Sequence, residues 1–269
     1  MSSATIQLDL GGEQPITIQR ITMERPWAWL GNGFRDLMRN PGASLGYGIF
    51  WTVISVGLSA GLWSMGQGSW LLPLVAGFML AGPLIAVGLY QISRDAQAGR
   101  TPSLGRALVA WKANAAQIAL LGVLLMIFLL AWIRFATLLF ALFFGTSLPS
   151  FEVSEIYLTL LLSGPGIALV LVGTLIGAVL AFIAFAMSVV SVPHLLADPK
   201  SSVLEAIIIS LAVVKHNLGP MILWAALLGA IGVAGLLPLF LGLVVVLPVL
   251  GHASWHAYEE LVSHPETGE

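Results

Sequence analysis

The sequence contains no cysteine. This absence excludes disulfide bonds, thiolate metal sites and a cysteine nucleophile, and it leaves the redox compartment undetermined. A phosphate-cradling glycine-rich loop with its lysine is also missing, and no Ser/His/Asp arrangement stands out. The segments outside the apolar runs are too short to house a soluble catalytic domain. We therefore expect a protein without enzymatic activity.

Charge is scarce throughout the chain. Only 9% of the 269 residues are charged, whereas 58% are hydrophobic. A soluble domain carries about a quarter charged residues, and one with so few would expose large apolar patches and aggregate. The lipid bilayer is therefore the expected medium. The net charge of -2 and the lack of a basic stripe with interleaved aromatics argue against nucleic acid as a partner.

Long apolar stretches predict six membrane-spanning helices, because a span needs roughly 20 residues. Their approximate bounds are 44–65, 70–90, 117–144, 166–194, 219–235 and 237–256. The last two come from one apolar run that is too long for a single crossing, so we expect it to fold back on itself. No Asp, Glu or Lys lies inside any predicted span, and proton relays and ion-coupled transporters ordinarily need such groups there.

Lys and Arg are missing from the connections on one side of the predicted membrane. Except for Arg134, every basic residue precedes the first span, or lies between the second and third or between the fourth and fifth. These residues are Arg20, Arg25, Arg35, Arg39, Arg94, Arg100, Arg106, Lys112, Lys200 and Lys215. Cytoplasmic loops retain positive charge. The asymmetry predicts a protein of the bacterial inner membrane with both termini in the cytoplasm.

The three basic segments are also amphipathic. Apolar residues recur at helical spacing after Pro26, with Trp27 and Trp29 expected at headgroup level. The same spacing recurs in the other two segments, at Leu104, Leu108 and Trp111 and at Val203, Ile207, Leu211 and Val214. The sequence thus predicts an all-α polytopic membrane protein with six spans in three hairpins, each preceded by a cytoplasmic amphipathic interfacial helix.

Two tails are expected to flank the membrane domain. Residues 1–25 form a polar N-terminal tail, 26–262 the six-helix membrane domain and 263–269 a C-terminal tail. Isoleucines at positions 16, 18 and 21 give the first tail a weak extended pattern. No partner strand for this pattern is evident in the sequence.

Histidines provide the only candidate ligands for a cofactor. His252 and His256 are four residues apart and therefore share one helical face, a spacing that can hold a metal or contribute a haem ligand. His194 is expected on the same side of the membrane, so a three-histidine site is geometrically possible. Alternatively, the pair is an interfacial polar cluster, since Trp255 and Tyr258 lie beside it. Nothing in the sequence requires a haem or a metal.

Arg134 is the one charge inside an apolar run and a candidate functional residue. Its place about 25 Å along the third span favours a boundary residue that snorkels and pairs with Glu152 or Glu155. Two glycine pairs, Gly57/Gly61 and Gly173/Gly177, have the spacing of close membrane-helix contacts. Packing within one bundle is favoured over dimerisation.

Several motifs lie between about Ile21 and Leu261, namely Pro26–Leu30, Gly33–Leu37, Gly82–Leu84, Gly88–Tyr90, Ser93-Arg94, Ser188–Pro193 and Leu250–Tyr258. Together they resemble a bacterial family of six-helix inner-membrane proteins known as domain of unknown function 2189. The resemblance implies a fold and a location but no established activity. Some members carry the label cytochrome c oxidase subunit I. Such a catalytic subunit needs more histidine ligands within its spans than the five histidines of this chain can supply.

Three functions remain open from the sequence. The first is a non-catalytic accessory or assembly component that binds other inner-membrane protein subunits. The second is a small-molecule or lipid transporter or channel-like protein. The threefold repetition of an amphipathic helix followed by a hairpin suggests it, as do prolines in the even-numbered spans. The third is a haem- or metal-binding redox subunit that uses His252 and His256.

Overall fold

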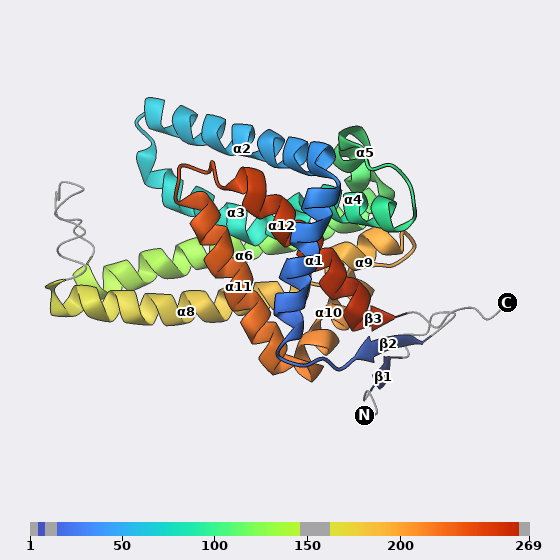
Figure 1. The fold of residues 1–269 in the computed structure, drawn as a ribbon. Helices are drawn as coiled ribbons and strands as arrows, with labels where there is room; N and C mark the ends of the chain where they lie inside the picture. The colour runs from blue at the N-terminus through green and yellow to red at the C-terminus, as the bar shows by residue number, and fades with distance from the viewer. Residues whose placement is uncertain (1–4, 9–14, 146–161, 264–269) are drawn as a thin grey trace. The chain divides into compact units, whose positions relative to one another are not determined.

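The computed structural model describes residues 5–8, 15–145 and 162–263, and within them the chain is almost entirely helical (Figure 1). The elements in chain order are β1 (Thr5–Leu8), β2 (Ile16–Gln19), α1 (Arg25–Arg39), α2 (Pro41–Ser64), η1 (Gly68–Trp70), α3 (Leu71–Ile85), α4 (Val87–Gln97), α5 (Leu104–Val109), η2 (Ala110–Asn114), α6 (Ala115–Phe144), α8 (Gly164–Ser188), α9 (Ser191–Ala197), α10 (Val203–His216), α11 (Leu218–Leu236), α12 (Leu243–Leu261) and β3 (Val262–Ser263). Figure 1 uses the same labels.

Five helical stretches among the described residues are long and apolar enough to cross a membrane. They are Pro41–Ser64, Pro73–Gln97, Leu104–Phe144, Gly164–Ala197 and Leu218–Leu236. Each coincides with one of the first five predicted spans, so the predicted all-α polytopic membrane fold is confirmed. The predicted partners of Arg134, Glu152 and Glu155, lie outside the described residues.

Two predicted boundaries differ from the structure. The second apolar stretch continues past residue 90 through α4, so it contains an acidic residue, Asp95. This carboxylate is paired with Arg100 and Arg106 at 3.0 Å each, which explains how it is tolerated. The sixth predicted span begins at 237, but α12 begins at Leu243. The residues between form a turn in which Leu239 and Phe240 have positive φ angles, a conformation that a helix excludes.

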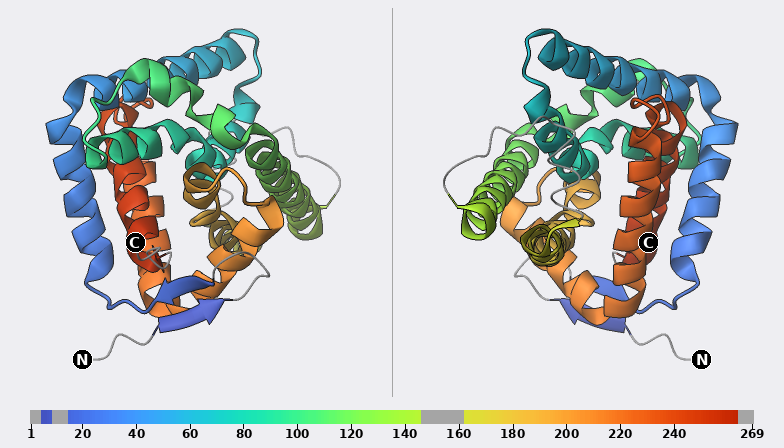
Figure 2. Two further views of the ribbon diagram at one scale, coloured as in Figure 1. Left: turned by 90° about the vertical axis from the view of Figure 1, so that its right-hand side faces the viewer. Right: turned by 90° about the vertical axis from the view of Figure 1, so that its left-hand side faces the viewer.

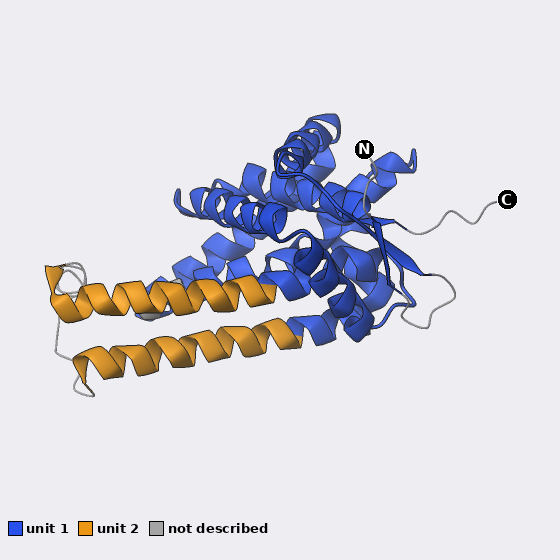
Figure 3. Cartoon of the chain, turned by 90° about the horizontal axis from the view of Figure 1, so that it is seen from below, with its two compact units in different colours: residues 1–122, 185–269 blue, residues 123–184 orange. Residues whose placement is uncertain are grey.

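The chain forms two compact units (Figure 3). Unit 2, residues 123–184, contains the distal parts of α6 and α8. These two helices run side by side, and Gly177 allows Trp132 close to the α8 backbone, since a Cβ there would lie 3.3 Å from the indole nitrogen. Arg134 is on α6 in this unit and is exposed. At the other glycine of the predicted pair, Gly173, an added Cβ would meet nothing within 4 Å.

Unit 1, residues 1–122 and 185–269, is organised around α12, which contacts α1, α2, α4, α9 and α11 (Figure 2). Trp29 of α1 is fully buried in this unit. Its ring meets that of Trp224 on α11 edge to face, with centroids 5.4 Å apart. The prediction that Trp29 lies at headgroup level is therefore wrong, because its position on α1 turns it toward α11. Trp27, on the opposite side of α1, is exposed.

A small antiparallel sheet joins the two ends of the described chain. Strand β2 pairs with β1 on one side and with β3 on the other, so that Ile18 lies opposite Val262. The weak extended pattern of the N-terminal segment thus has two partners that the sequence did not reveal. One of them follows α12 directly, which places residues 16–19 and 262–263 on the same side of the bundle.

Glycines bring the helices of unit 1 into backbone contact. A Cβ on Gly33 of α1 would lie 2.7 Å from the backbone nitrogen of Ala253 on α12. A Cβ on Gly251 would lie 2.7 Å from the Cβ of Leu89 on α4. Close approach of this kind is how membrane helices gain van der Waals contact without a hydrophobic driving force between them. The glycines therefore fix how α1 and α4 lie against α12.

Gly33 and Gly31 form a matched pair for testing this packing. We expect Gly33→Ala to destabilise unit 1 by about 1–3 kcal/mol, because its methyl group would collide with α12. Gly31→Ala meets nothing within 4 Å and should be neutral or stabilising by up to about 1 kcal/mol through helix propensity. Unfolding of the full chain in mild detergent, followed by tryptophan fluorescence, measures both. Equal effects of the two substitutions would contradict the packing argument.

Candidate functional site: a buried Asp–His–Ser network

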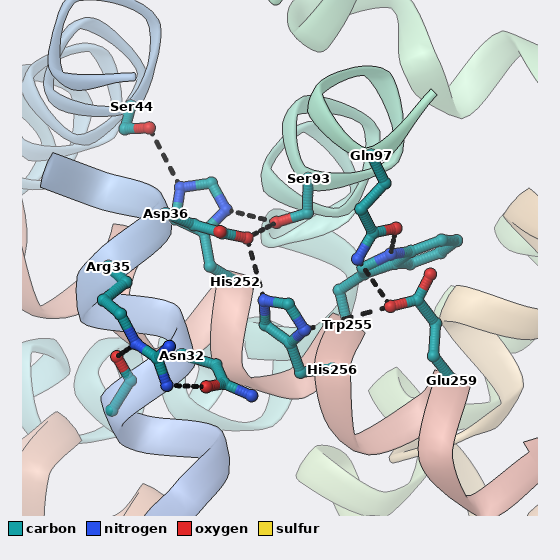
Figure 4. Close-up of polar contacts among 11 residues, drawn as sticks. Asn32, Arg35, Asp36, Ser44, Ser93, Gln97, His252, Trp255, His256 and Glu259 are labelled. Carbon is teal, nitrogen blue, oxygen red and sulfur yellow. Dashed lines mark hydrogen bonds and ion pairs between the residues drawn. The ribbon is translucent and has the colours of Figure 1, made fainter. Parts of the chain in front are cut away.

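Five polar side chains from four helices meet inside unit 1. Asp36 comes from α1, Ser44 from α2, Ser93 from α4, and His252 and His256 from α12 (Figure 4). Ser44, Ser93 and His252 are fully buried, and Asp36 is nearly so. This is the largest internal cluster of hydrogen-bonded, titratable side chains that links separate helices in the described part of the chain.

The five side chains form one continuous series of hydrogen bonds. The Nε2 atom of His256 lies 2.9 Å from Oδ2 of Asp36, and the hydroxyl of Ser93 donates to the same oxygen at 2.8 Å. Nδ1 of His252 lies 2.8 Å from that hydroxyl oxygen, and its Nε2 lies 2.9 Å from the hydroxyl of Ser44. The series therefore runs from the partly exposed His256 to the fully buried Ser44.

The donors and acceptors of this series follow from the chemistry of its members. The hydroxyl of Ser93 has one proton and gives it to the carboxylate, so its oxygen accepts from Nδ1–H of His252. The remaining ring nitrogen, Nε2, then accepts from the hydroxyl of Ser44. This assignment describes a neutral His252 in which both nitrogens are used. No polar atom of the ring is left for another ligand.

Asp36 keeps its charge although it is buried. Burial alone raises the pKa of this carboxyl, but the hydrogen bonds from His256 and Ser93 outweigh burial, with His252 nearby, so its pKa is lowered below the usual value. Hydrogen bonds to a carboxylate favour its ionised form. The network is therefore arranged around one stabilised negative charge.

Local structure explains why the five side chains converge. Helix α1 ends at Arg39 and α2 begins at Pro41, with only Asn40 between them, so the chain turns sharply between Asp36 and Ser44. His252 and His256 are four residues apart and project from the same face of α12. Because Gly33 lets α1 approach the α12 backbone, the short Asp36 side chain reaches both α4 and α12.

A second set of contacts continues from the network along α12. Trp255 donates its indole N–H to Gln97 at 3.0 Å, and Gln97 donates to Glu259 at 2.6 Å. Glu259 lies 3.9 Å from Nδ1 of His256. Further along, Glu260 accepts from Trp29 at 2.6 Å and pairs with Arg25. Polar residues of α12 from His252 to Glu260 thus hold α1 and α4 over about two helical turns.

The predicted cofactor ligands occupy two separate places. His252 and His256 face α1, α2 and α4, whereas His194 on α9 meets α12 through Tyr258, with Nδ1 3.3 Å from the phenol oxygen. Among the described residues, no group of three or more His, Asp or Glu side chains is arranged to hold a metal ion. Both ring nitrogens of His252 are engaged by serine hydroxyls.

The sequence points to the two histidines but not to their partners. Asp36 falls on the polar face of the predicted amphipathic helix, and no local pattern marks Ser44 or Ser93. One signal was present: the motifs that carry the family resemblance contain Asp36, Ser93, His252 and His256. They lie far apart in the chain and meet only in the folded structure.

The fold defines the class of protein: it is a polytopic integral membrane protein with an internal network of polar side chains in unit 1. Residues 71–197, from α3 to α9, match the family model described as "Predicted integral membrane protein (DUF2189)". The resemblance to this family is thereby confirmed over those residues. No curated protein and no solved structure matches the chain.

Replacement of Asp36 by Asn should give a pH-dependent loss of stability. The folded-state pKa of Asp36 is lowered, so its stabilising contribution is complete above the unfolded-state pKa of about 3.9 and disappears as the pH falls through the folded-state value. We expect Asp36→Asn to cost about 1–3 kcal/mol at pH 7, and the difference from wild type to shrink below about pH 4. Unfolding in detergent between pH 3 and 8 measures this. A difference that grows toward low pH would contradict it.

Ser93 and Ser44 should differ in their contribution, although both are fully buried. Ser93→Ala removes the link between Asp36 and His252, whereas Ser44→Ala removes only a terminal hydrogen bond. We expect roughly 2–4 kcal/mol for the first and about 1 kcal/mol for the second, since an unpaired buried group carries its full desolvation cost. Unfolding measurements on both variants test the order, and a reversed order would refute the network as described.

Proposed function

We propose that this protein is a non-catalytic accessory or assembly component of a larger complex in the bacterial inner membrane. The observation that carries the proposal is an unfilled glycine pair on α2. Gly57 and Gly61 have the spacing of a close helix–helix contact, and a Cβ added at either position would have no atom of the described residues within 4 Å. The neighbouring Val53 is 64% exposed.

Other glycines of unit 1 fall into two groups. Gly31, Gly42, Gly82 and Gly229 also have no described atom within 4 Å of an added Cβ, whereas a second group is closely packed. Gly33, Gly48, Gly88 and Gly251 each lie against another helix so closely that a Cβ would collide with it. Glycine also carries a helix-propensity cost of about 1 kcal/mol relative to alanine, which close packing offsets. At Gly57 and Gly61 no packing contact from residues 5–8, 15–145 or 162–263 offsets this cost. A helix of another membrane subunit is the partner that such a surface fits.

The internal network supports a structural role over the other two functions. Its hydrogen-bonding atoms are used within the chain, which fastens α1, α2, α4 and α12 together. Its inner end at Ser44 lies one turn from Gly48, where the backbones of α2 and α12 touch at Val244. We therefore favour helix packing over ion or proton transport at this contact. The engaged nitrogens of His252 likewise give a redox centre no ligand there.

We further propose six crossings, with both termini in the cytoplasm. The ends of the membrane domain meet in one sheet, because β2 precedes α1 and β3 follows α12. An even number of crossings must separate two strands that pair on one side of a bilayer. Five stretches qualify by length and composition, so α12 supplies the return. The basic residues of the connecting segments favour the cytoplasm for that side.

Substitutions in the open glycine pair test the accessory role. We expect Gly57→Leu with Gly61→Leu to abolish stoichiometric co-purification of a second membrane protein from native membranes in mild detergent. The substituted chain should remain as stable as wild type, since the added side chains meet no atom of its own and raise helix propensity. Val56→Leu, on another face of α2, is the matched control and should retain the partner. Recovery of wild type alone, or only with copies of itself, would contradict the proposal.

A further inference from the structure

Helix α1 has a second, outward face that the internal network does not use. Trp27, Gly31, Phe34 and Met38 recur at intervals of four, three and four residues, so they share one side of the helix. Trp27 is 57% exposed, and Phe34 and Met38 are also exposed. Arg39 follows in the last turn. The outward face is thus apolar along its length and cationic at the end that leads into α2.

Helix α10 repeats this design. Leu204, Ile208 and Leu211 are exposed, and Lys215 follows at the same spacing in the last turn. The opposite face of α10 is buried against the rest of unit 1, with Ile209 and Val213 fully inaccessible. The outward residues are therefore not needed for the core of this unit.

The third example is formed by α5 with η2. Val109 and Trp111 are exposed, and Lys112 lies over the Trp111 ring, 5.9 Å from its centroid. In all three examples an asparagine follows the Lys or Arg by one or two residues. The next long helix begins directly after this asparagine. These asparagines are Asn40, Asn114 and Asn217.

Their position locates these faces at a membrane surface. Helices α1 and α10 lead directly into stretches long enough to cross the bilayer, α2 and α11, and α5 with η2 forms the first part of the stretch Leu104–Phe144, which continues as α6. All three belong to unit 1, where α1 contacts α12, α5 contacts α4 and α10 contacts α9. A helix that lies in the interface buries its apolar face at the acyl boundary and directs its cations to the headgroups.

We infer that α1, α5–η2 and α10 form a collar that binds anionic phospholipid headgroups. Arg39, Lys112 and Lys215 contact the phosphates, and the exposed aromatic and aliphatic residues beside them hold the acyl boundary. Charge complementarity favours an anionic partner, because each apolar face ends in a Lys or Arg. Among the described residues, none of the three elements has an exposed Asp or Glu in its last turn. The inference is independent of the accessory role, which concerns α2.

The simpler explanation of these cations is local. A basic residue at the end of a helix interacts favourably with the helix dipole, and such an effect stabilises the protein in any lipid. A lipid-binding collar instead makes the response depend on the charge of the lipid and on ionic strength. A lipid titration therefore separates the two explanations.

The experiment compares phosphatidylglycerol with phosphatidylcholine on the full chain in neutral detergent, with native mass spectrometry to count retained lipid. We expect wild type to retain phosphatidylglycerol preferentially and to lose the preference at high salt. Arg39→Gln, Lys112→Gln and Lys215→Gln should each weaken phosphatidylglycerol binding about fivefold, since a cation near an anionic surface contributes about that factor. The triple variant should lose roughly 100-fold, with phosphatidylcholine binding unchanged.

Lys200→Gln is the control, because Lys200 is exposed in the turn between α9 and α10 but lies on none of the three faces. It should bind phosphatidylglycerol like wild type. Thermal unfolding in phosphatidylcholine micelles checks that each variant is folded. Equal retention of both lipids by wild type would overturn the inference. A triple variant that still prefers phosphatidylglycerol would also overturn it. A triple variant that is destabilised equally in both lipids would support the helix-dipole explanation instead.

Discussion

Unit 1 depends on the contact between α12 and the two helices that cross it, α1 and α2. Gly33 and Gly48 allow this contact at the level of the backbone, and Asp36 and Ser44 then reach the histidines of α12. The close contact between the helices and the hydrogen bonds to the histidines require each other. Without the close approach, short side chains could not bridge the helices, and without the hydrogen bonds the buried carboxylate would carry an uncompensated desolvation cost.

Burial of the Asp36 carboxylate carries a desolvation free energy that opposes folding. A buried ion pair often stabilises a fold less than apolar packing would, but removal of one partner is strongly destabilising. In this chain the carboxylate of Asp36 has two donors from two different helices, so a shift of α1 along α12 would break both bonds. Apolar helix surfaces can pack in several positions along one another. Hydrogen bonds require particular distances and angles, so they select one of these positions. We interpret the network as this kind of register device.

Much of the fold could be predicted from the sequence, because apolar length and charge asymmetry report directly on the bilayer. Five of the six predicted apolar segments coincide with stretches long enough to cross a membrane, and they followed from apolar length. The placement of His252 and His256 on one helical face followed from periodicity. The position of Trp29 did not, because α1 has two apolar sides and periodicity cannot say which one faces protein. The hydrogen-bond partners of the histidines could not be predicted either. Ser93 is 57 residues from Asp36 and 159 residues from His252 in the chain, so only tertiary packing brings the three together.

The two faces of α1 connect the internal network to the bilayer. Asp36 and Gly33 fix its inner side to α12, and this fixes the direction in which Trp27 and Phe34 point. Trp27 and Phe34 lie on the opposite side of the same helix and are exposed. A rotation of α1 that turned Trp27 inward would withdraw Asp36 from His256 and Ser93. The hydrogen bonds within the protein and the contact with lipid therefore select the same orientation of α1, so that each stabilises the geometry that the other needs.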